Sequence, residues 1–188
     1  DIKAPLNIMT EYLSYNLEYK GFGKTGNHVI NNARALLFAS IFLNNNSFSI
    51  LSYSILKESL HDLISDDGFL REGSSHYQFI FTRWILEMLW LSKISNKSDI
   101  YDFLHPFSSK LVKQCRFFIV EDSDDDLLRI PLIGDVSPDF PVSWLSTLPF
   151  STIARDVYGN YEIRNSKNGD YGWASLMDRL LELYPKVQ

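Results

Sequence analysis

The sequence is poor in cysteine, in long apolar runs and in basic charge. Its one cysteine among 188 residues, Cys115, can form no intramolecular disulfide and no cysteine-based metal site. No run of about 18 consecutive apolar residues is present, so we expect no membrane span. The 18 Lys and Arg against 23 Asp and Glu give a net charge of −5, and the basic residues are scattered. This distribution argues against nucleic acid as a partner.

Apolar and aromatic residues are abundant. Hydrophobic residues make up 45% of the chain and aromatic residues 14%, and the mean hydropathy is −0.11. This composition excludes disorder and coiled coil, and it predicts a single globular domain over residues 1–188. The chain begins at Asp1 with no initiator Met and no signal-peptide pattern, so we expect a fragment of a longer protein.

Apolar residues recur at spacings of three and four along most of the chain, which predicts an all-α fold. The segments with this period are about 5–19, 27–43, 48–64, 75–95, 99–119, 142–156 and 172–184. Residues 159–172 contain Asn168-Gly169, a turn dipeptide that predicts one short hairpin.

Two of these segments, 27–43 and 75–95, are apolar on nearly every side, which predicts helices enclosed by other helices. They alternate with the more amphipathic segments 48–64 and 99–119. Such alternation is what two concentric layers of antiparallel helical hairpins would produce. Residues near 27 and 75 would then lie at one end, and the loop 134–139 would return to the same rim.

Two motifs fall at that rim. Gly26-Asn27-His28 opens a helix, with Thr25 or Asn27 as its cap, and each side chain alone is more often structural than functional. Gly73-Ser74-Ser75 starts the next enclosed helix and places His76 and Tyr77 in its first turn. Beside Arg71 and His76, the Tyr77 phenol is predicted to have a pKa below its ordinary value of about 10, although packing is the commoner role of a tyrosine.

Three motifs in order carry a family resemblance. Gly26-Asn27-His28 is followed about fifty residues later by the run from Asp67 to Tyr77, and then by Gly134-Asp135-Val136-Ser137-Pro138-Asp139. In order, spacing and helical context the sequence resembles the heparinase II/III family and the related toroid alginate lyases over roughly residues 20 to 145.

The resemblance implies an incomplete (α/α) toroid of antiparallel helical hairpins, without the C-terminal β-sandwich domain that usually follows. Relatives cleave uronic-acid polysaccharides by β-elimination, usually in the periplasm or after secretion. By this resemblance Asn27 neutralises the uronate carboxylate, His28 lies beside it, and Tyr77 is the acid or base. Seven helices are fewer than the ten to twelve or so of the family, and some relatives take a further catalytic histidine from the β-sandwich.

The implied partner is an acidic polysaccharide, and the reaction requires no metal and no cofactor. Removing a proton α to a carboxylate builds charge that hydrogen-bond donors must neutralise. The expected substrate-binding residues are Arg71, Glu72, His76 and Asp135. A local positive potential is also expected from side chains near the two motifs, namely Lys24, His28, Arg34, Arg71 and His76.

Two other functions stay open. Glu72 and Asp135 would suit the acid and base of an inverting glycoside hydrolase, whose carboxyl groups lie about 6.5–9.5 Å apart. A noncatalytic polysaccharide-binding or biosynthesis-associated toroid would keep an aromatic groove without tuned pKa values. The acidic run 121–126 is interpreted as a solvated loop, and His61 and His105 as structural.

Overall fold

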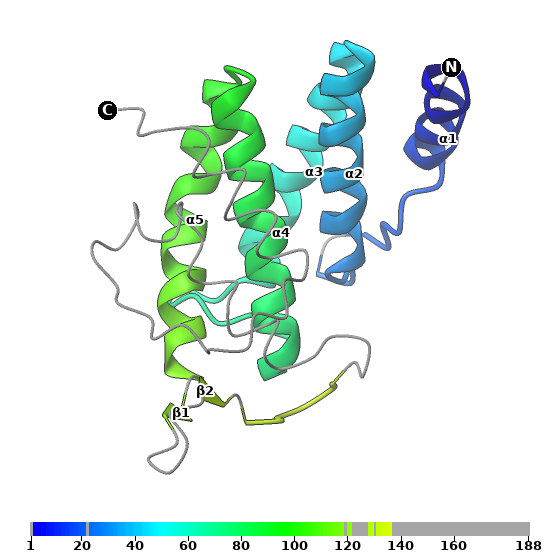
Figure 1. The fold of residues 1–188 in the computed structure, drawn as a ribbon. Coiled ribbons are helices and arrows are strands. Elements are labelled where there is room, and N and C mark those ends of the chain that lie inside the picture. Colours follow the sequence, from blue (N-terminus) through cyan, green and yellow to red (C-terminus); the bar gives the residue numbers. More distant parts are fainter. Residues whose placement is uncertain (1, 22, 119, 122–127, 130, 137–188) are drawn as a thin grey trace.

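The computed structural model describes residues 2–21, 23–118, 120–121, 128–129 and 131–136. Within these ranges the chain is all-helical apart from one pair of two-residue strands, which confirms the predicted fold class (Figure 1). The helices are α1 (Lys3–Tyr15), α2 (His28–Leu43), α3 (Asn46–Leu63), α4 (Ser75–Ile94) and α5 (Ser98–Phe117). The helices expected at 142–156 and 172–184, and the hairpin at 159–172, lie outside the described residues.

Four of the predicted helices have nearly the predicted bounds, but α1 ends at Tyr15 instead of residue 19. The backbone after it bonds to side chains rather than to its own helix. The Glu18 amide donates to Asn32 Oδ1 at 2.9 Å, and the Lys20 amide donates to Thr25 Oγ1 at 3.0 Å. These bonds replace helical ones and lead the chain to the start of α2.

Short strands lie where the sequence predicted only a polar loop. β1 (Val120–Glu121) pairs antiparallel with β2 (Leu128–Arg129), with Val120 opposite Arg129. Residues 122–126, which are most of the acidic run 121–126, lie outside the described part of the chain.

The helices form two antiparallel hairpins, α2 with α3 and α4 with α5, and the hairpins meet where α2 packs on α4 (Figure 1). A left-handed Asn44, with φ 55°, ends α2, and Asn45 Oδ1 accepts the Ser47 amide at 3.0 Å to cap α3. α1 lies at the edge and packs on α2. None of the helices among the described residues has the length and apolar character needed to cross a membrane.

The prediction of two enclosed helices is confirmed for α4 and wrong for α2. Fifteen of the twenty residues of α4 are buried, including Arg83 and Glu87. α2 buries Leu36 and Leu37 on one face, but Phe42 on another face is 51% exposed. Both helices have apolar sequences, so hydrophobicity alone did not show that neighbours cover only part of α2.

Candidate functional site

The starts of α2 and α4 lie at the same end of the bundle, because the helices alternate in direction (Figure 1). Asn27 immediately precedes α2, and Glu72 lies three residues before α4. Asn27 Nδ2 donates to Glu72 Oε2 at 2.5 Å, across 45 residues of sequence. This bond joins the two motifs that the sequence placed at one rim.

The Asn27 side chain is not used as a helix cap. Asn27 occupies the N-cap position of α2, but its side chain makes no capping hydrogen bond. Thr25, the other predicted cap, bonds instead to the carbonyl of Gly21 at 2.8 Å. Asn27 is 3% exposed, so its amide is a buried donor directed at the Glu72 carboxylate.

The turn that carries Glu72 is held by Gln78 of α4. The Gln78 amide accepts the Leu70 N–H at 2.7 Å and donates to the Gly68 carbonyl at 3.1 Å. Gly68 has φ +98°, and a Cβ there would lie 2.6 Å from the Lys110 carbonyl oxygen of α5. Glycine is therefore needed at this point for a close approach to α5, and the turn is fixed between α4 and α5.

Residues 131–136 run beneath the start of α4, where the yellow trace passes in Figure 1. The Ser75 hydroxyl donates to the Pro131 carbonyl at 2.6 Å, and the Ser75 amide donates to the Ile133 carbonyl at 3.0 Å. The Ser74 hydroxyl donates to the Asp135 carbonyl and caps α4 by accepting the Tyr77 amide at 3.1 Å. Asp135 thus reaches the end of the bundle that carries Asn27 and Glu72.

Glu72 is in an unfavourable environment for a carboxylate. Desolvation by burial, and then the nearby Asp135, raise the pKa of Glu72, against the opposing effects of Asn27 and His28. The Glu72 carboxylate lies against the amide of Asn27 in this structure, and its predicted contact with substrate stays a prediction.

The predicted low pKa of Tyr77 is wrong. Burial, followed by the charges of Asp135 and Glu72, raises the pKa of the Tyr77 phenol. The sequence placed the cations Arg71 and His76 next to this side chain in the chain, but the anions are its electrostatic neighbours in space. The phenol is therefore a protonated donor at neutral pH.

His28 lies on the surface with a carboxylate partner. Its Nδ1 lies 3.0 Å from Glu18 Oε2, and the two side chains are 65% and 54% exposed. Glu18 was not found from the sequence, because it lay within a predicted helix ten residues before His28. A carboxylate on Nδ1 orients the ring and leaves Nε2 to accept a proton.

Two expected substrate-binding residues differ sharply in exposure. Arg71 is exposed, whereas His76 is 1% exposed. Burial lowers the pKa of His76, although Asp135 opposes this effect. His76 therefore packs as a neutral ring beneath the surface, and its predicted contact with substrate stays a prediction.

The expected positive cluster does not form as predicted. Arg34 Nε lies 3.2 Å from Glu87 Oε2, inside the α2–α4 contact, and His28 is matched by Glu18. Glu72 and Asp135 add two carboxylates at the same end. The sequence around the two motifs predicted cations at this end of the bundle. In the structure Arg34 pairs with Glu87 instead, and the acids Glu72 and Asp135 lie at this end.

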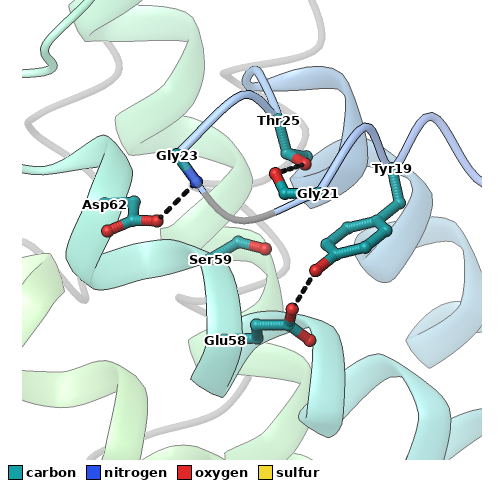
Figure 2. A pocket seen from close by; sticks show the side chains of 7 residues that line it. All are labelled: Tyr19, Gly21, Gly23, Thr25, Glu58, Ser59 and Asp62. Atoms are coloured by element: carbon teal, nitrogen blue, oxygen red, sulfur yellow. Dashed lines mark hydrogen bonds between the residues drawn. The ribbon is translucent and has the colours of Figure 1, made fainter.

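A small hollow lies beside this site, where the loop before Asn27 crosses α3 (Figure 2). The Tyr19 hydroxyl donates to Glu58, and the Gly23 amide donates to Asp62 Oδ2 at 3.1 Å. The hydrogen bond to Glu58 raises the pKa of Tyr19. Glu58 and Asp62 are one helical turn apart, which was the available sequence signal. The two acids anchor the loop that leads to Asn27.

In the described part of the chain, no three His, Cys, Asp or Glu side chains are placed to hold a metal ion. His61 packs edge-on against Phe107, with ring centroids 5.0 Å apart. His105 contacts Tyr101 at 5.8 Å. These ring contacts agree with a structural interpretation of both histidines.

Comparisons of this chain with family models, curated proteins and solved structures found no match. The resemblance to the heparinase II/III family therefore stands on the three motifs alone. The geometry around Asn27, Glu72 and Tyr77 is the remaining basis for a function.

Proposed function

We propose that the protein is a polysaccharide lyase that cleaves uronic-acid-containing polysaccharides by β-elimination at the end carrying Asn27, His28 and Tyr77. The observation that carries this proposal is the bond from Asn27 to Glu72 at 2.5 Å. It is made by a buried amide that has no capping bond to make. Such an amide is a donor suited to the carboxylate of a uronate.

The reaction removes one proton from the carbon next to the broken bond and adds one proton to the leaving oxygen. A base removes the proton at C5 of the uronate, α to the carboxylate, and negative charge grows on that group. Hydrogen bonds from Asn27 stabilise the growing charge. The bond from C4 to the glycosidic oxygen then breaks, a double bond forms between C4 and C5, and an acid protonates the leaving oxygen.

The proposed base, His28, and the proposed acid, Tyr77, differ in their surroundings. Glu18 holds Nδ1 of His28 at 3.0 Å, which leaves Nε2 as the base. The raised pKa of Tyr77 keeps its phenol protonated, which suits the acid. Tyr77 and His28 both have Glu72 as an electrostatic neighbour, in agreement with a shared site.

The finer architecture belongs to the same proposal. We infer that the two hairpins form part of an (α/α) toroid of a longer protein, which acts on acidic polysaccharide in the periplasm or outside the cell. Support comes from the resemblance and from the alternation of helices, in which α2 contacts α4. In the family that the sequence resembles, a β-sandwich domain usually follows the toroid.

An inverting glycoside hydrolase is the second candidate, and the environment of Glu72 favours it. The pKa of Glu72 is raised by burial and by Asp135. A protonated carboxylic acid near a carboxylate is the pairing that such an enzyme uses. In that case Glu72 is the acid and Asp135 the base, and Tyr77 has no catalytic part.

The experiment is an assay of the protein on uronate and neutral polysaccharides, with product absorbance in the far ultraviolet and reducing ends measured together. A lyase gives both signals. Tyr77→Phe should lower turnover by about 10²-fold or more without changing the unfolding transition. Tyr53→Phe, which removes the hydroxyl of another partly buried tyrosine, should leave turnover unchanged.

The other outcomes identify the alternatives. Reducing ends without absorbance, lost in Glu72→Gln and retained in Tyr77→Phe, would establish the hydrolase. Binding without either signal would establish a noncatalytic domain.

A further inference from the structure

Glu72 already makes the contact that the proposed substrate requires. Asn27 is 3% exposed, and its Nδ2 donates to Glu72 Oε2 at 2.5 Å. In the proposed reaction the same amide donates to the carboxylate of the uronate. An incoming carboxylate can therefore reach Asn27 only when Glu72 moves or shares the amide.

We propose that Glu72 is a specificity-determining residue, whose ionised carboxylate keeps acidic sugars from Asn27 until it is protonated or displaced. This inference rests on the proposed function, because it assumes that Asn27 binds the uronate carboxylate. It assigns Glu72 the opposite role from a substrate ligand.

Charge around Glu72 opposes a second anion. His28 faces it from α2, Asp135 from residues 131–136 and Tyr77 from α4. Of these, only His28 can be cationic, and Glu18 already lies 3.0 Å from it. A uronate carboxylate arriving beside ionised Glu72 and Asp135 meets like charges at short range.

Protonation reverses the effect of Glu72. A protonated carboxyl group carries an O–H, so Glu72 would donate to the uronate carboxylate instead of repelling it. Burial and Asp135 raise the pKa of Glu72, which brings this change closer to neutral pH. Acidic conditions should therefore open the site to acidic sugars.

The turn around Glu72 also permits displacement. Gly73, the next residue, has φ +71°, and a Cβ built there meets nothing within 4 Å. On the other side, the Leu70 amide is fixed by Gln78 at 2.7 Å. Glu72 itself is an exposed residue on this held turn, so its side chain can leave Asn27 without unfolding the turn.

The test compares Glu72→Gln, which keeps the size and an acceptor oxygen, with Glu72→Ala, which uncovers Asn27. Both are made in a Tyr77→Phe background so that no sugar is cleaved, and calorimetry measures binding of a uronic-acid oligosaccharide and of a neutral one of equal length. At neutral pH both variants should bind the uronate about fivefold or more tightly than the background protein. Binding of the neutral sugar should not change.

The pH dependence gives a second readout. Uronate affinity of the background protein should rise as pH falls towards about 5, whereas that of Glu72→Gln should not show this rise. Glu11→Gln, which removes a charge from the exposed face of α1, is the matched control and should behave as the background protein.

The results that would overturn this inference differ from those that would reject the proposed function. Weaker uronate binding by Glu72→Ala with unchanged binding by Glu72→Gln would mean that Glu72 positions Asn27 for the substrate. If the Glu72 variants and the background protein bind the uronate with equal affinity at every pH, and the wild type still forms unsaturated product, then Glu72 does not determine specificity. No uronate binding by any of the proteins would reject the proposed function, and this inference with it.

Discussion

Two carboxylates join the α4 region to α2, and their surroundings are opposite. Glu87, in the middle of α4, is 3% exposed and lies 2.5 Å from Arg83 Nε and 3.2 Å from Arg34 Nε. Glu72, before α4, accepts a bond from the neutral amide of Asn27 and has Asp135 as a neighbour that raises its pKa. One carboxylate is matched by cations, and the other is placed near another acid.

The difference separates a structural charge from a functional one. A buried charge is tolerated when it is paired and hydrogen-bonded, and removing one partner is costly. When desolvation and a like charge raise the pKa of a carboxyl group, its ionised form is less stable than it would be in water. Such groups concentrate at functional sites. We therefore expect Glu87 to matter for folding and Glu72 to matter for binding.

The largest expected effect on stability is at Glu87. Glu87→Gln keeps the shape but removes the negative charge between Arg83 and Arg34, so it should lower the free energy of unfolding by about 3–5 kcal/mol. Urea unfolding followed by circular dichroism measures this change. Glu11→Gln on the surface of α1 should stay within about 0.5 kcal/mol of wild type. A similarly small effect for Glu87→Gln would remove the distinction between the two carboxylates.

A smaller effect is expected where residues 131–136 meet α4. Gly134 has φ +73°, and a Cβ there would lie 2.7 Å from the Gly73 carbonyl oxygen. Gly134→Ala should cost about 1–3 kcal/mol and loosen Asp135 from the start of α4. Gly26→Ala is the control, since a Cβ at Gly26 meets nothing within 4 Å. Equal unfolding midpoints for the two variants would show that this contact does not hold Asp135.

The expected stability effect at Glu72 is smaller still and has the opposite sign. Its folded pKa is raised, so the folded state binds more protons than the unfolded state, and stability falls as pH rises from the unfolded to the folded pKa. Glu72→Gln should therefore be more stable than wild type at neutral pH, by less than about 1 kcal/mol because the carboxyl group is only partly removed from solvent, which screens its charge. The gain should vanish below the ordinary glutamate pKa. A loss of stability at neutral pH would make Glu72 structural, like Glu87.

The smallest effect is expected at Cys115 of α5, whose rate of reaction with thiol reagents reports on the packing of α5 against α4. Burial raises the pKa of the Cys115 thiol to about 12, and the side chain packs against Thr82 Oγ1 at 3.2 Å. Thiol reagents should modify it only as fast as the protein unfolds. Modification of the folded protein at the rate of a free thiol would contradict the packing of α4 against α5.

Helices were predictable from the sequence because their apolar period is local, and four of them have nearly the predicted bounds. The meeting of Asn27 with the start of α4 followed from helix alternation alone. The roles of neighbouring charges were not predictable. Arg34 turns inward to Glu87, and His76 is buried, because tertiary packing decides which face of each helix is covered.

The environment of Tyr77 shows the same limit. Sequence neighbours supplied cations, but Asp135 arrives from 58 residues further on through carbonyl bonds to Ser74 and Ser75. Backbone carbonyls leave no pattern in the sequence, so the sign of the Tyr77 pKa shift could be read only from the fold.

The most direct test of the central claim, that Asn27 and its neighbours receive an acidic sugar, is a binding titration at two ionic strengths. A uronic-acid oligosaccharide and a neutral one of equal length are titrated into Tyr77→Phe protein, with and without Asn27→Ala, at about 0.05 and 0.5 M salt. The account predicts that only the uronate binds, at either salt concentration, and that Asn27→Ala abolishes this binding. Equal, salt-independent affinity for both sugars, unaffected by Asn27→Ala, would contradict it.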